Sequence, residues 1–195
     1  MYYRKGRVSA CGSAIRKDFR PDHTSTALER LDAAGALDIA RLNMVEFAFG
    51  VTGHNDVAGT PRNPWNTDHM TGGSSTGGSI RLPAACCGLV GMKPTYGRVS
   101  RHGAMPLAYS LDTVGPLTRT VRDNVLMMQA IAGHDANDPV TAGTPVGDYL
   151  GELEKDVRGL KVGLPESFFY EDVAPEVRTL VEASLKVFED RGCEI

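Results

Sequence analysis

The sequence predicts an α/β fold, because helical and strand-like patterns alternate along the chain. Residues 24–34, 120–132 and 175–191 carry apolar side chains at helical spacing, and a glycine directly follows each segment. Short apolar runs at residues 36–40 and 160–164 have the length and composition of strands, and the second is expected to be buried. Elements that alternate in this way pack as layers of helix on sheet.

Each long helix has a recognisable start. Thr24 or Ser25 precedes the first helix and can cap it. Thr120 caps the second helix, and Asp123 lies in its first turn, where a carboxylate interacts favourably with the helix dipole. Pro175 suits the first turn of the third helix, whose apolar residues form one stripe that predicts a buried face: Val177, Leu180, Val181, Leu185 and Phe188.

The segments between these helices predict shorter elements. Residues 43–49 suit a helix of one or two turns. Residues 50–79 are rich in turns and weakly periodic, which indicates an ordered loop packed over a core. A helix is expected over residues 80–90, with Pro83 near its start, and a short strand over residues 95–100.

The composition is that of an ordinary globular protein. The 195 residues are 42% hydrophobic and 23% charged, with a net charge of -3. The absence of a basic block argues against a nucleic-acid or anionic membrane surface. No apolar run approaches the ~20 residues of a membrane-spanning helix, and the basic N-terminus lacks the apolar segment of a secretory signal. The sequence therefore predicts a cytoplasmic protein with no nucleic-acid or membrane partner.

Neither a metal nor a cofactor is expected. The cysteines lack CxxC spacing, and Cys86 and Cys87 lie in an apolar stretch, which favours reduced, buried thiols. The five histidines are scattered without ligand spacing. The glycine-rich stretch at residues 70–83 is not a Walker A loop, because no Gly-Lys-Ser/Thr follows, and it lacks the dinucleotide fingerprint.

That glycine-rich stretch is the strongest candidate for a site. It leads directly into an apolar segment that a solvated linker would not carry. Backbone N–H groups of Gly77, Gly78 and Ser79 could form a nest for a developing oxyanion. Ser74 and Ser79 lie on the same loop, and a nucleophilic hydroxyl beside a second one that relays its proton is a plausible hydrolase arrangement.

The motifs in and around this stretch resemble those of a known family. Residues 72–75 read Gly-Gly-Ser-Ser, residues 76–85 read Thr-Gly-Gly-Ser-Ile-Arg-Leu-Pro-Ala-Ala, and residues 87–100 include Gly-Met-Lys-Pro-Thr-Tyr-Gly-Arg-Val-Ser. The flanking segments 42–48 and 110–120 agree. Over almost the whole chain, the sequence resembles the amidase signature family. The resemblance implies part of that family's fold, a mixed β-sheet covered by helices.

The family hydrolyses or transfers amides with a Ser–cis-Ser–Lys triad. The resemblance implies Ser79 as the nucleophile and Ser74, after a cis Gly73–Ser74 bond, as the proton relay. A cis bond before a non-proline residue costs roughly 3–4 kcal/mol, so only a well-supported site holds one. The resemblance also implies an oxyanion hole made by the backbone N–H groups of Thr76, Gly77, Gly78 and Ser79.

The chain departs from the family pattern in two places. The two loops of the site are fused between Ser75 and Thr76, where the family has about 20 more residues, roughly one helix and one strand. The family's lysine precedes the segment that residues 1–9 resemble, and the Lys17–Asp18 pair lacks the matching context. We therefore expect residues 1–195 to be one amidase signature domain, incomplete at both ends and at the fused loops, and nearly inactive alone.

The function implied by the resemblance is hydrolysis of a small-molecule amide through an acyl-enzyme on Ser79, without a cofactor. A free-standing amidase is preferred, because nothing in the sequence marks a surface for partner subunits. One alternative is the A subunit of a tRNA-dependent amidotransferase, which releases ammonia from glutamine. Another is an inactive remnant that binds a sibling chain. Unpaired sheet edges are expected to favour self-association.

Two further residues have open interpretations. Asp112 could position Arg81 or Arg98, or it could be the carboxylate of a turn. Trp65, the single tryptophan, is most simply part of the core or of an interface.

Overall fold

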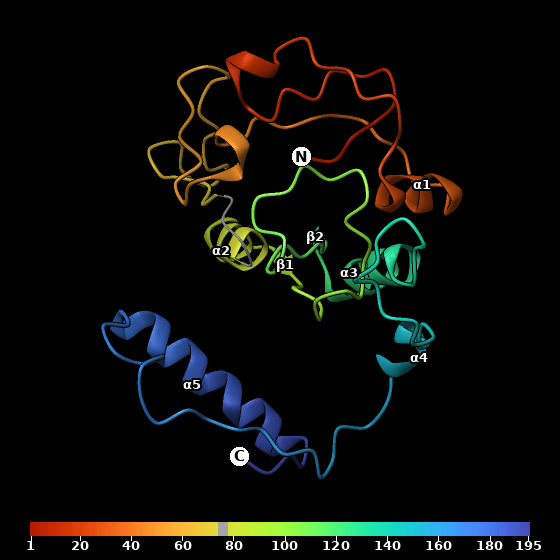
Figure 1. Cartoon of the computed structure of the whole chain (residues 1–195). Coiled ribbons are helices and arrows are strands. Elements are labelled where there is room, and N and C mark those ends of the chain that lie inside the picture. Colours follow the sequence, from red (N-terminus) through yellow and green to blue (C-terminus); the bar gives the residue numbers. More distant parts are fainter. Residues whose placement is uncertain (74–77) are drawn as a thin grey trace. The chain divides into compact units, whose positions relative to one another are not determined.

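The computed structural model describes residues 1–73 and 78–195. The chain divides into two compact units, unit 1 (Met1–Leu150) and unit 2 (Gly151–Ile195) (Figure 1). The elements of unit 1 are η1 (Ala14–Arg16), α1 (Thr26–Ala33), η2 (Glu46–Ala48), α2 (Gly78–Cys87), β1 (Val90–Gly91), β2 (Leu117–Thr118) and α3 (Val121–Ile131). A short helix, α4 (Tyr149–Glu152), crosses the boundary, and α5 (Pro175–Asp190) belongs to unit 2.

Strand pairing is sparse in the described part of the chain. β1 and β2 form a two-stranded antiparallel sheet, with Val90 opposite Thr118 and Gly91 opposite Leu117. Single bridges add antiparallel pairs at Tyr2–Ala104 and Val99–Ala132 and a parallel pair at Lys161–Glu194. Helices combined with sheet pairing in both directions agree with the predicted partial α/β fold.

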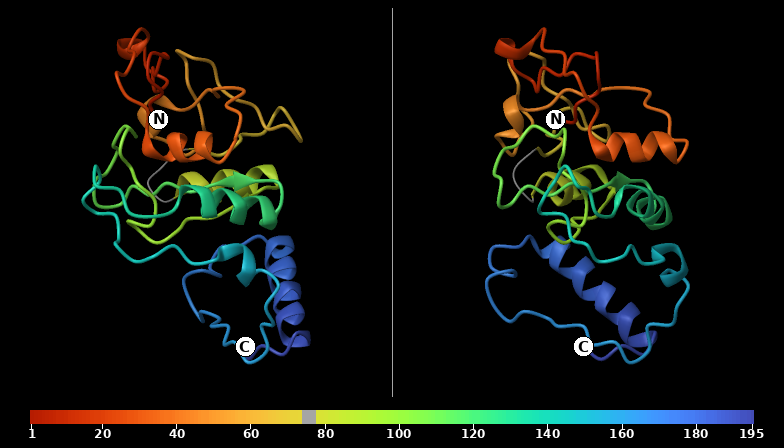
Figure 2. Two further views of the ribbon diagram at one scale, coloured as in Figure 1. Left: turned by 90° about the vertical axis from the view of Figure 1, so that its right-hand side faces the viewer. Right: turned by 45° about the vertical axis from the view of Figure 1, so that its right-hand side comes forward.

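The core of unit 1 lies between α1, α3 and the loops beside them. Its buried residues are Ala27, Val99, Val114, Met128, Ile131 and Ala132. The two helices lie side by side (Figure 2). Arg30 of α1 reaches across and donates to the carbonyls of Ile131 (2.9 Å), Gly133 (3.1 Å) and His134 (2.6 Å). A guanidinium thus satisfies carbonyls that the end of α3 leaves without intrahelical partners.

A buried asparagine joins α3 to the sheet. The side-chain nitrogen of Asn124 lies 3.0 Å from the carbonyl of Val90, 3.3 Å from that of Pro116 and 3.1 Å from the hydroxyl of Thr118. These contacts fix α3 against both strands. They also satisfy an amide that is almost fully buried and would otherwise destabilise the fold.

The three long predicted helices are confirmed. Thr120 caps α3, since its hydroxyl accepts a hydrogen bond from the backbone N–H of Asp123 at 3.1 Å. Ser25 is the N-cap of α1 but makes no cap hydrogen bond with its side chain. The helix expected at residues 80–90 is α2, which starts two residues earlier and ends three residues earlier, at Cys87, with Pro83 inside it.

Other predicted elements are wrong or shorter than expected. Residues 36–40 form no strand, and Leu37 and Ile39 are 86% and 91% exposed. Residues 160–164 contain a single bridge at Lys161, and both leucines in that run are exposed, so the buried strand is also wrong. A short apolar run becomes a strand only where a neighbouring strand pairs with it. Residues 43–49 contain only the three-residue helix η2, and residues 95–100 contain only a bridge at Val99.

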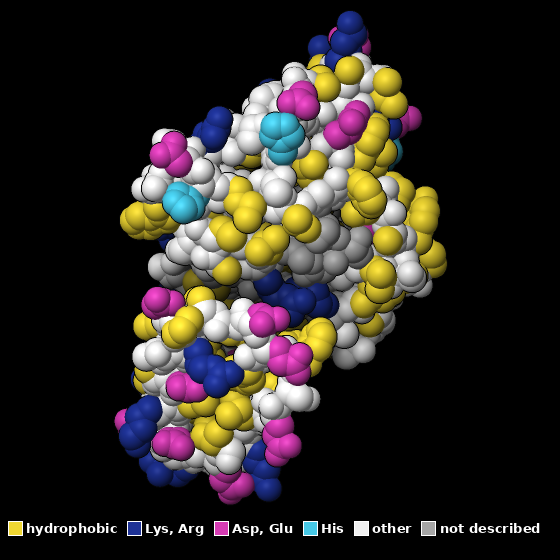
Figure 3. All heavy atoms as spheres, turned by 90° about the vertical axis from the view of Figure 1, so that its left-hand side faces the viewer, with side chains coloured by type: hydrophobic (Ala, Val, Ile, Leu, Met, Phe, Trp, Pro, Cys, Tyr) yellow, Lys and Arg dark blue, Asp and Glu magenta, His cyan; other side chains and the backbone are white. Residues whose placement is uncertain are grey.

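Unit 2 consists of α5 and the chain that leads into it. Gly192 follows the helix, and Glu194 pairs with Lys161 beyond it. The apolar stripe is where the prediction fails: Val177, Leu180, Val181 and Phe188 are exposed, and Leu185 is half-buried. Figure 3 shows hydrophobic side chains on the molecular surface, interspersed with charged ones. Among the described helices, none is long and apolar enough to cross a membrane.

Candidate functional site

The described part of the candidate site centres on α2, whose second residue is Ser79. Backbone N–H groups in the first turn of a helix have no intrahelical acceptor, and the helix dipole places partial positive charge there. The start of α2 therefore has the polarity that a developing oxyanion requires. Gly78 and Ser79, two of the predicted site residues, lie in this first turn.

Close packing against β1 holds α2 in place. Ile80 and Ala84, one turn apart on the same face, are both buried. A Cβ atom at Gly91 of β1 would lie 2.7 Å from the Cβ of Ala84 and from the carbonyl oxygen of Ile80. Only glycine therefore allows the strand to approach the helix this closely.

The far end of α2 is also fixed. Gly88 ends the helix with a φ of +63°, and the N–H of Leu89 closes back on the carbonyl of Ala84 at 2.8 Å. The indole N–H of Trp65 donates to the carbonyl of Cys87 at 2.8 Å. Trp65 is mostly exposed, so of its two interpretations the core residue is wrong, and the interface residue stays a prediction.

The segment at residues 71–72 packs against the side of α2. A Cβ atom at Gly72 would lie 3.2 Å from the backbone of Pro83, so this stretch runs directly alongside the helix. The thiol of Cys87 donates to the carbonyl of Thr71 at 3.4 Å. Burial raises the pKa of the Cys87 thiol, and Cys86 adds to the effect, which keeps the thiol protonated as a donor.

Three predicted site residues, Ser74, Thr76 and Gly77, lie outside the described residues, as does the predicted cis bond between Gly73 and Ser74. No cis peptide bond occurs within residues 1–73 and 78–195. The roles of Ser74 and Ser79, and the four-residue oxyanion hole, remain predictions.

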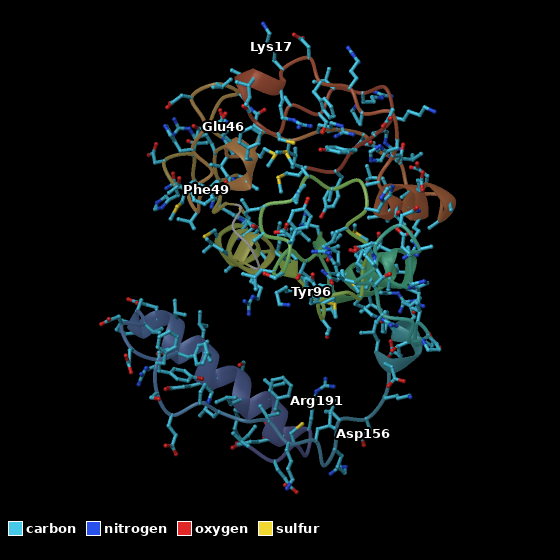
Figure 4. The ribbon with its side chains drawn as sticks, in the orientation of Figure 1. Lys17, Glu46, Phe49, Tyr96, Asp156 and Arg191 are labelled. Carbon is cyan, nitrogen blue, oxygen red and sulfur yellow. The ribbon has the colours of Figure 1, made fainter. Side chains whose placement is uncertain are left out.

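All six lysines lie in described parts of the chain, and the family's base would have to be one that is buried near the serines. Lys5, Lys17, Lys155, Lys161 and Lys186 are exposed. Figure 4 shows Lys17 beside η1, pointing outward from unit 1. Lys93 is half-buried, and its ammonium donates to the carbonyl of Pro94 at 2.9 Å. None of the six is fully buried.

Asp112 is the carboxylate of a turn, which decides between its two interpretations. Its Oδ2 accepts hydrogen bonds from the backbone N–H groups of Leu107 (2.8 Å) and Ala108 (3.0 Å). Arg98 instead donates to the hydroxyl of Tyr149 at 2.5 Å.

Sequence reasoning missed the buried asparagines around the site. Asn55 donates to the carbonyls of Gly12 (2.8 Å) and Met44 (2.6 Å), and it accepts from the backbone N–H groups that follow it. Asn63 makes a similar set of bonds beside α2. The Asn63–Pro64 dipeptide is a local turn signal, but nothing in the sequence shows which distant carbonyls a buried amide will meet.

Metal chemistry finds no support in the described residues. Within residues 1–73 and 78–195, no group of three or more histidine, cysteine, aspartate or glutamate side chains could hold a metal ion.

Comparison with known proteins establishes the family. The amidase family model matches residues 2–77 and 75–195, which together cover nearly the whole chain. The chain therefore belongs to the amidase family. The two matched segments overlap at residues 75–77, within the glycine- and serine-rich stretch.

The curated relatives include glutamyl-tRNA(Gln) amidotransferase A subunits. The subunit from Exiguobacterium sibiricum is 44% identical over 98% of this chain and 44% of its own length. That from Bacillus velezensis is 45% identical over 96% of this chain and 43% of its own length. The chain thus spans somewhat less than half the length of these relatives.

Solved structures show the same fold. The A subunit from Thermotoga maritima superimposes with a TM-score of 0.93 at 35% identity, over 99% of this chain and 47% of that one. The native peptide amidase from Stenotrophomonas maltophilia gives a TM-score of 0.87 at 30% identity, over 99% of this chain and 45% of that one. Both comparisons confirm a partial amidase fold.

Proposed function

We propose that the site around Ser79 carries out amide hydrolysis through an acyl-enzyme. The observation that carries the proposal is the place of Ser79 in the first turn of α2, a helix fixed at both ends, in a chain of the amidase family. The Ser79 hydroxyl attacks the amide carbonyl, and its proton passes through Ser74 toward the leaving nitrogen. The N–H groups of residues 76–79 stabilise the oxyanion. Ammonia leaves, and water then hydrolyses the ester.

The 195-residue chain by itself is proposed to be nearly inactive. Five of its six lysines are exposed and Lys93 is half-buried, so none matches the fully buried amine that the proposed triad needs as its base. The alignment with the Pelobacter propionicus A subunit supports the missing internal segment, because it spans 213 positions while covering all 195 residues of this chain, a difference of 18. A relay displaced by about 1 Å can cost roughly 100-fold in rate.

Glutamine is the second candidate substrate. It is favoured by the names of the curated relatives, which are amidotransferase A subunits at 44–45% identity, whereas the peptide amidase is 30% identical. In this case the ammonia would be passed to a partner subunit. Ammonia release from glutamine, compared with release from simple aliphatic and peptide amides, separates the two candidates.

A fluorophosphonate probe, which labels activated serines, tests the chemistry by intact mass. We expect no labelling of the chain alone. We expect labelling of a restored variant that carries the internal segment and the lysine-bearing segment of a relative, and loss of this labelling on Ser79→Ala. A folded restored variant that does not react, or that still reacts after Ser79→Ala, contradicts the assignment of Ser79. Labelling of the unrestored chain contradicts the expected inactivity.

A further inference from the structure

A buried side-chain amide lies where the glycine–serine segment and α2 meet. Asn63 is only 6% exposed. Its Nδ2 donates to the carbonyl of Met70 at 3.1 Å and to that of Cys86 at 2.8 Å. Its Oδ1 accepts from the backbone N–H of Trp65 at 3.0 Å. Both donor hydrogens and the acceptor of the amide are therefore used.

The two carbonyls that Asn63 binds belong to different segments of the chain, 7 and 23 residues after Asn63. The bond to Trp65 is an ordinary local turn contact, which asparagine often makes. The other two are different, because Met70 precedes the serine segment and Cys86 lies in the last turn of α2. Asn63 thus joins the two flanks of the segment that contains Ser79.

Two neighbouring hydrogen bonds join the end of α2 to the same stretch of chain, residues 63–71. Trp65 donates through its indole to the carbonyl of Cys87, and the Cys87 thiol donates to the carbonyl of Thr71. The last carbonyls of a helix have no intrahelical donor. Here the carbonyls of Cys86 and Cys87 accept hydrogen bonds from the side chains of Asn63 and Trp65.

We propose that Asn63 is a positioning residue, which sets the placement of α2, and therefore of Ser79, relative to the chain that leads into the serine segment. These hydrogen bonds end on the carbonyls of residues 70–71 and 86–87, one pair on each side of the segment that contains Ser79. A role of Asn63 in catalysis rests on the proposed role of Ser79. The effect of Asn63 on the placement of α2 does not depend on that role.

Asn63→Asp is the direct test, because it keeps the acceptor for the Trp65 N–H and replaces the two donors by a carboxylate facing two carbonyl oxygens. Asn66→Asp is the matched control: Asn66 is exposed, and its side-chain oxygen accepts from the backbone N–H of Asp68, a bond that aspartate retains. Amide hydrogen exchange of the full chain reports the outcome.

We expect Asn63→Asp to speed exchange in residues 69–73 and in α2 by at least about tenfold, as loss of buried hydrogen bonds implies, with α3 unchanged. Asn66→Asp should leave all three regions unchanged. Unchanged exchange in α2, or equal acceleration in α2 and α3, overturns the positioning role. Asn63→Leu, which has similar volume and no carboxylate, should give the same local effect and excludes charge repulsion as its sole cause.

Labelling by the fluorophosphonate in the restored variant separates this inference from the proposed function. Asn63→Asp should slow labelling at Ser79 by at least about tenfold, the same factor as for exchange. If the restored variant does not label at all, the proposed function fails while the exchange result still decides the role of Asn63. If labelling is unaffected while exchange accelerates, Asn63 stabilises the local fold without positioning Ser79.

Discussion

The helices α3 and α5 carry the same sequence signals and have opposite surroundings. Each has apolar residues at helical spacing and is followed by a glycine. On α3, Met128 is 1% exposed, because α1 and the segment around Val99 cover it. On α5, Leu180 is 72% exposed. Periodicity therefore predicts which face of a helix is apolar, and the burial of that face depends on a partner surface.

The polar contacts of the two helices differ in the same way. α3 is tied to the rest of unit 1 by Asn124 and by Arg30 of α1, through buried or half-buried hydrogen bonds. The charged pair on α5, Lys186 with Asp190 at 2.7 Å, is exposed. Such pairs contribute little to stability, whereas buried amides and guanidinium groups fix one element against another. Across residues 151–195, all of them described, only Cys193 is buried.

The largest expected effect on stability comes from a substitution in α3, the better-packed of the two helices. Met128→Ala should lower the free energy of unfolding by about 3 kcal/mol, because it leaves a cavity in a filled core. Leu180→Ala on α5 should change it by less than about 0.5 kcal/mol, because that side chain is already in solvent. Urea unfolding followed by circular dichroism measures both. Similar losses from the two substitutions would show that α5 is buried in solution.

The next largest expected effect is a pH dependence of stability, and it comes from a buried carboxylate in unit 1. Burial alone would raise the pKa of Asp135, but hydrogen bonds from Ser100 (2.5 Å) and Thr26 (2.6 Å) lower it from 3.8 to about 2. A lowered carboxyl pKa contributes stability that is fully present above pH 3.8 and is lost as the pH falls toward 2. The difference is about 2 kcal/mol.

Asp135→Asn should therefore lower the free energy of unfolding by about 2 kcal/mol at pH 7 and flatten its decline between pH 4 and 2. Asp68→Asn, on an exposed turn, is the control and should change neither quantity appreciably. Urea unfolding measured at a series of pH values decides the matter. An unchanged pH profile in Asp135→Asn would assign the acid sensitivity to other groups.

The N-terminal caps give a smaller effect. Thr120→Ala should destabilise unit 1 by about 1 kcal/mol, because the N–H of Asp123 loses its side-chain acceptor. Thr120→Ser keeps a hydroxyl and should retain most of that stability. Thermal unfolding of the two variants tests the cap, and equal melting temperatures would argue against it.

The smallest expected effect comes from giving α5 a side-chain N-cap, which α3 already has in Thr120. The N-cap of α5 is Ala174, which makes no side-chain hydrogen bond. Ala174→Asp should stabilise the helix by about 0.5–1 kcal/mol through capping and the helix dipole. Ala183→Asp, in the interior of the same helix, should weaken it. Amide exchange within residues 175–190 measures both, and slower exchange in the interior variant would contradict the capping argument.

Local chemistry explains which elements were predicted correctly. Thr120, Pro175 and the glycines that end the helices act on the backbone within one turn, so their effect is visible in the sequence. The incorrect strands at residues 36–40 and 160–164 had the right composition, but pairing depends on a second segment elsewhere. Family motifs identified Ser79 as the candidate nucleophile, and the structure adds that it lies in the first turn of a helix fixed at both ends.

The sequence by itself determined the family, the long helices and the candidate nucleophile, because motifs and caps are local patterns. The tertiary structure decided which apolar faces are buried and that Asn63 joins Met70 to Cys86. These outcomes depend on contacts between segments distant in sequence. A side chain's burial and its hydrogen-bond partners are set by whatever chain the fold brings beside it.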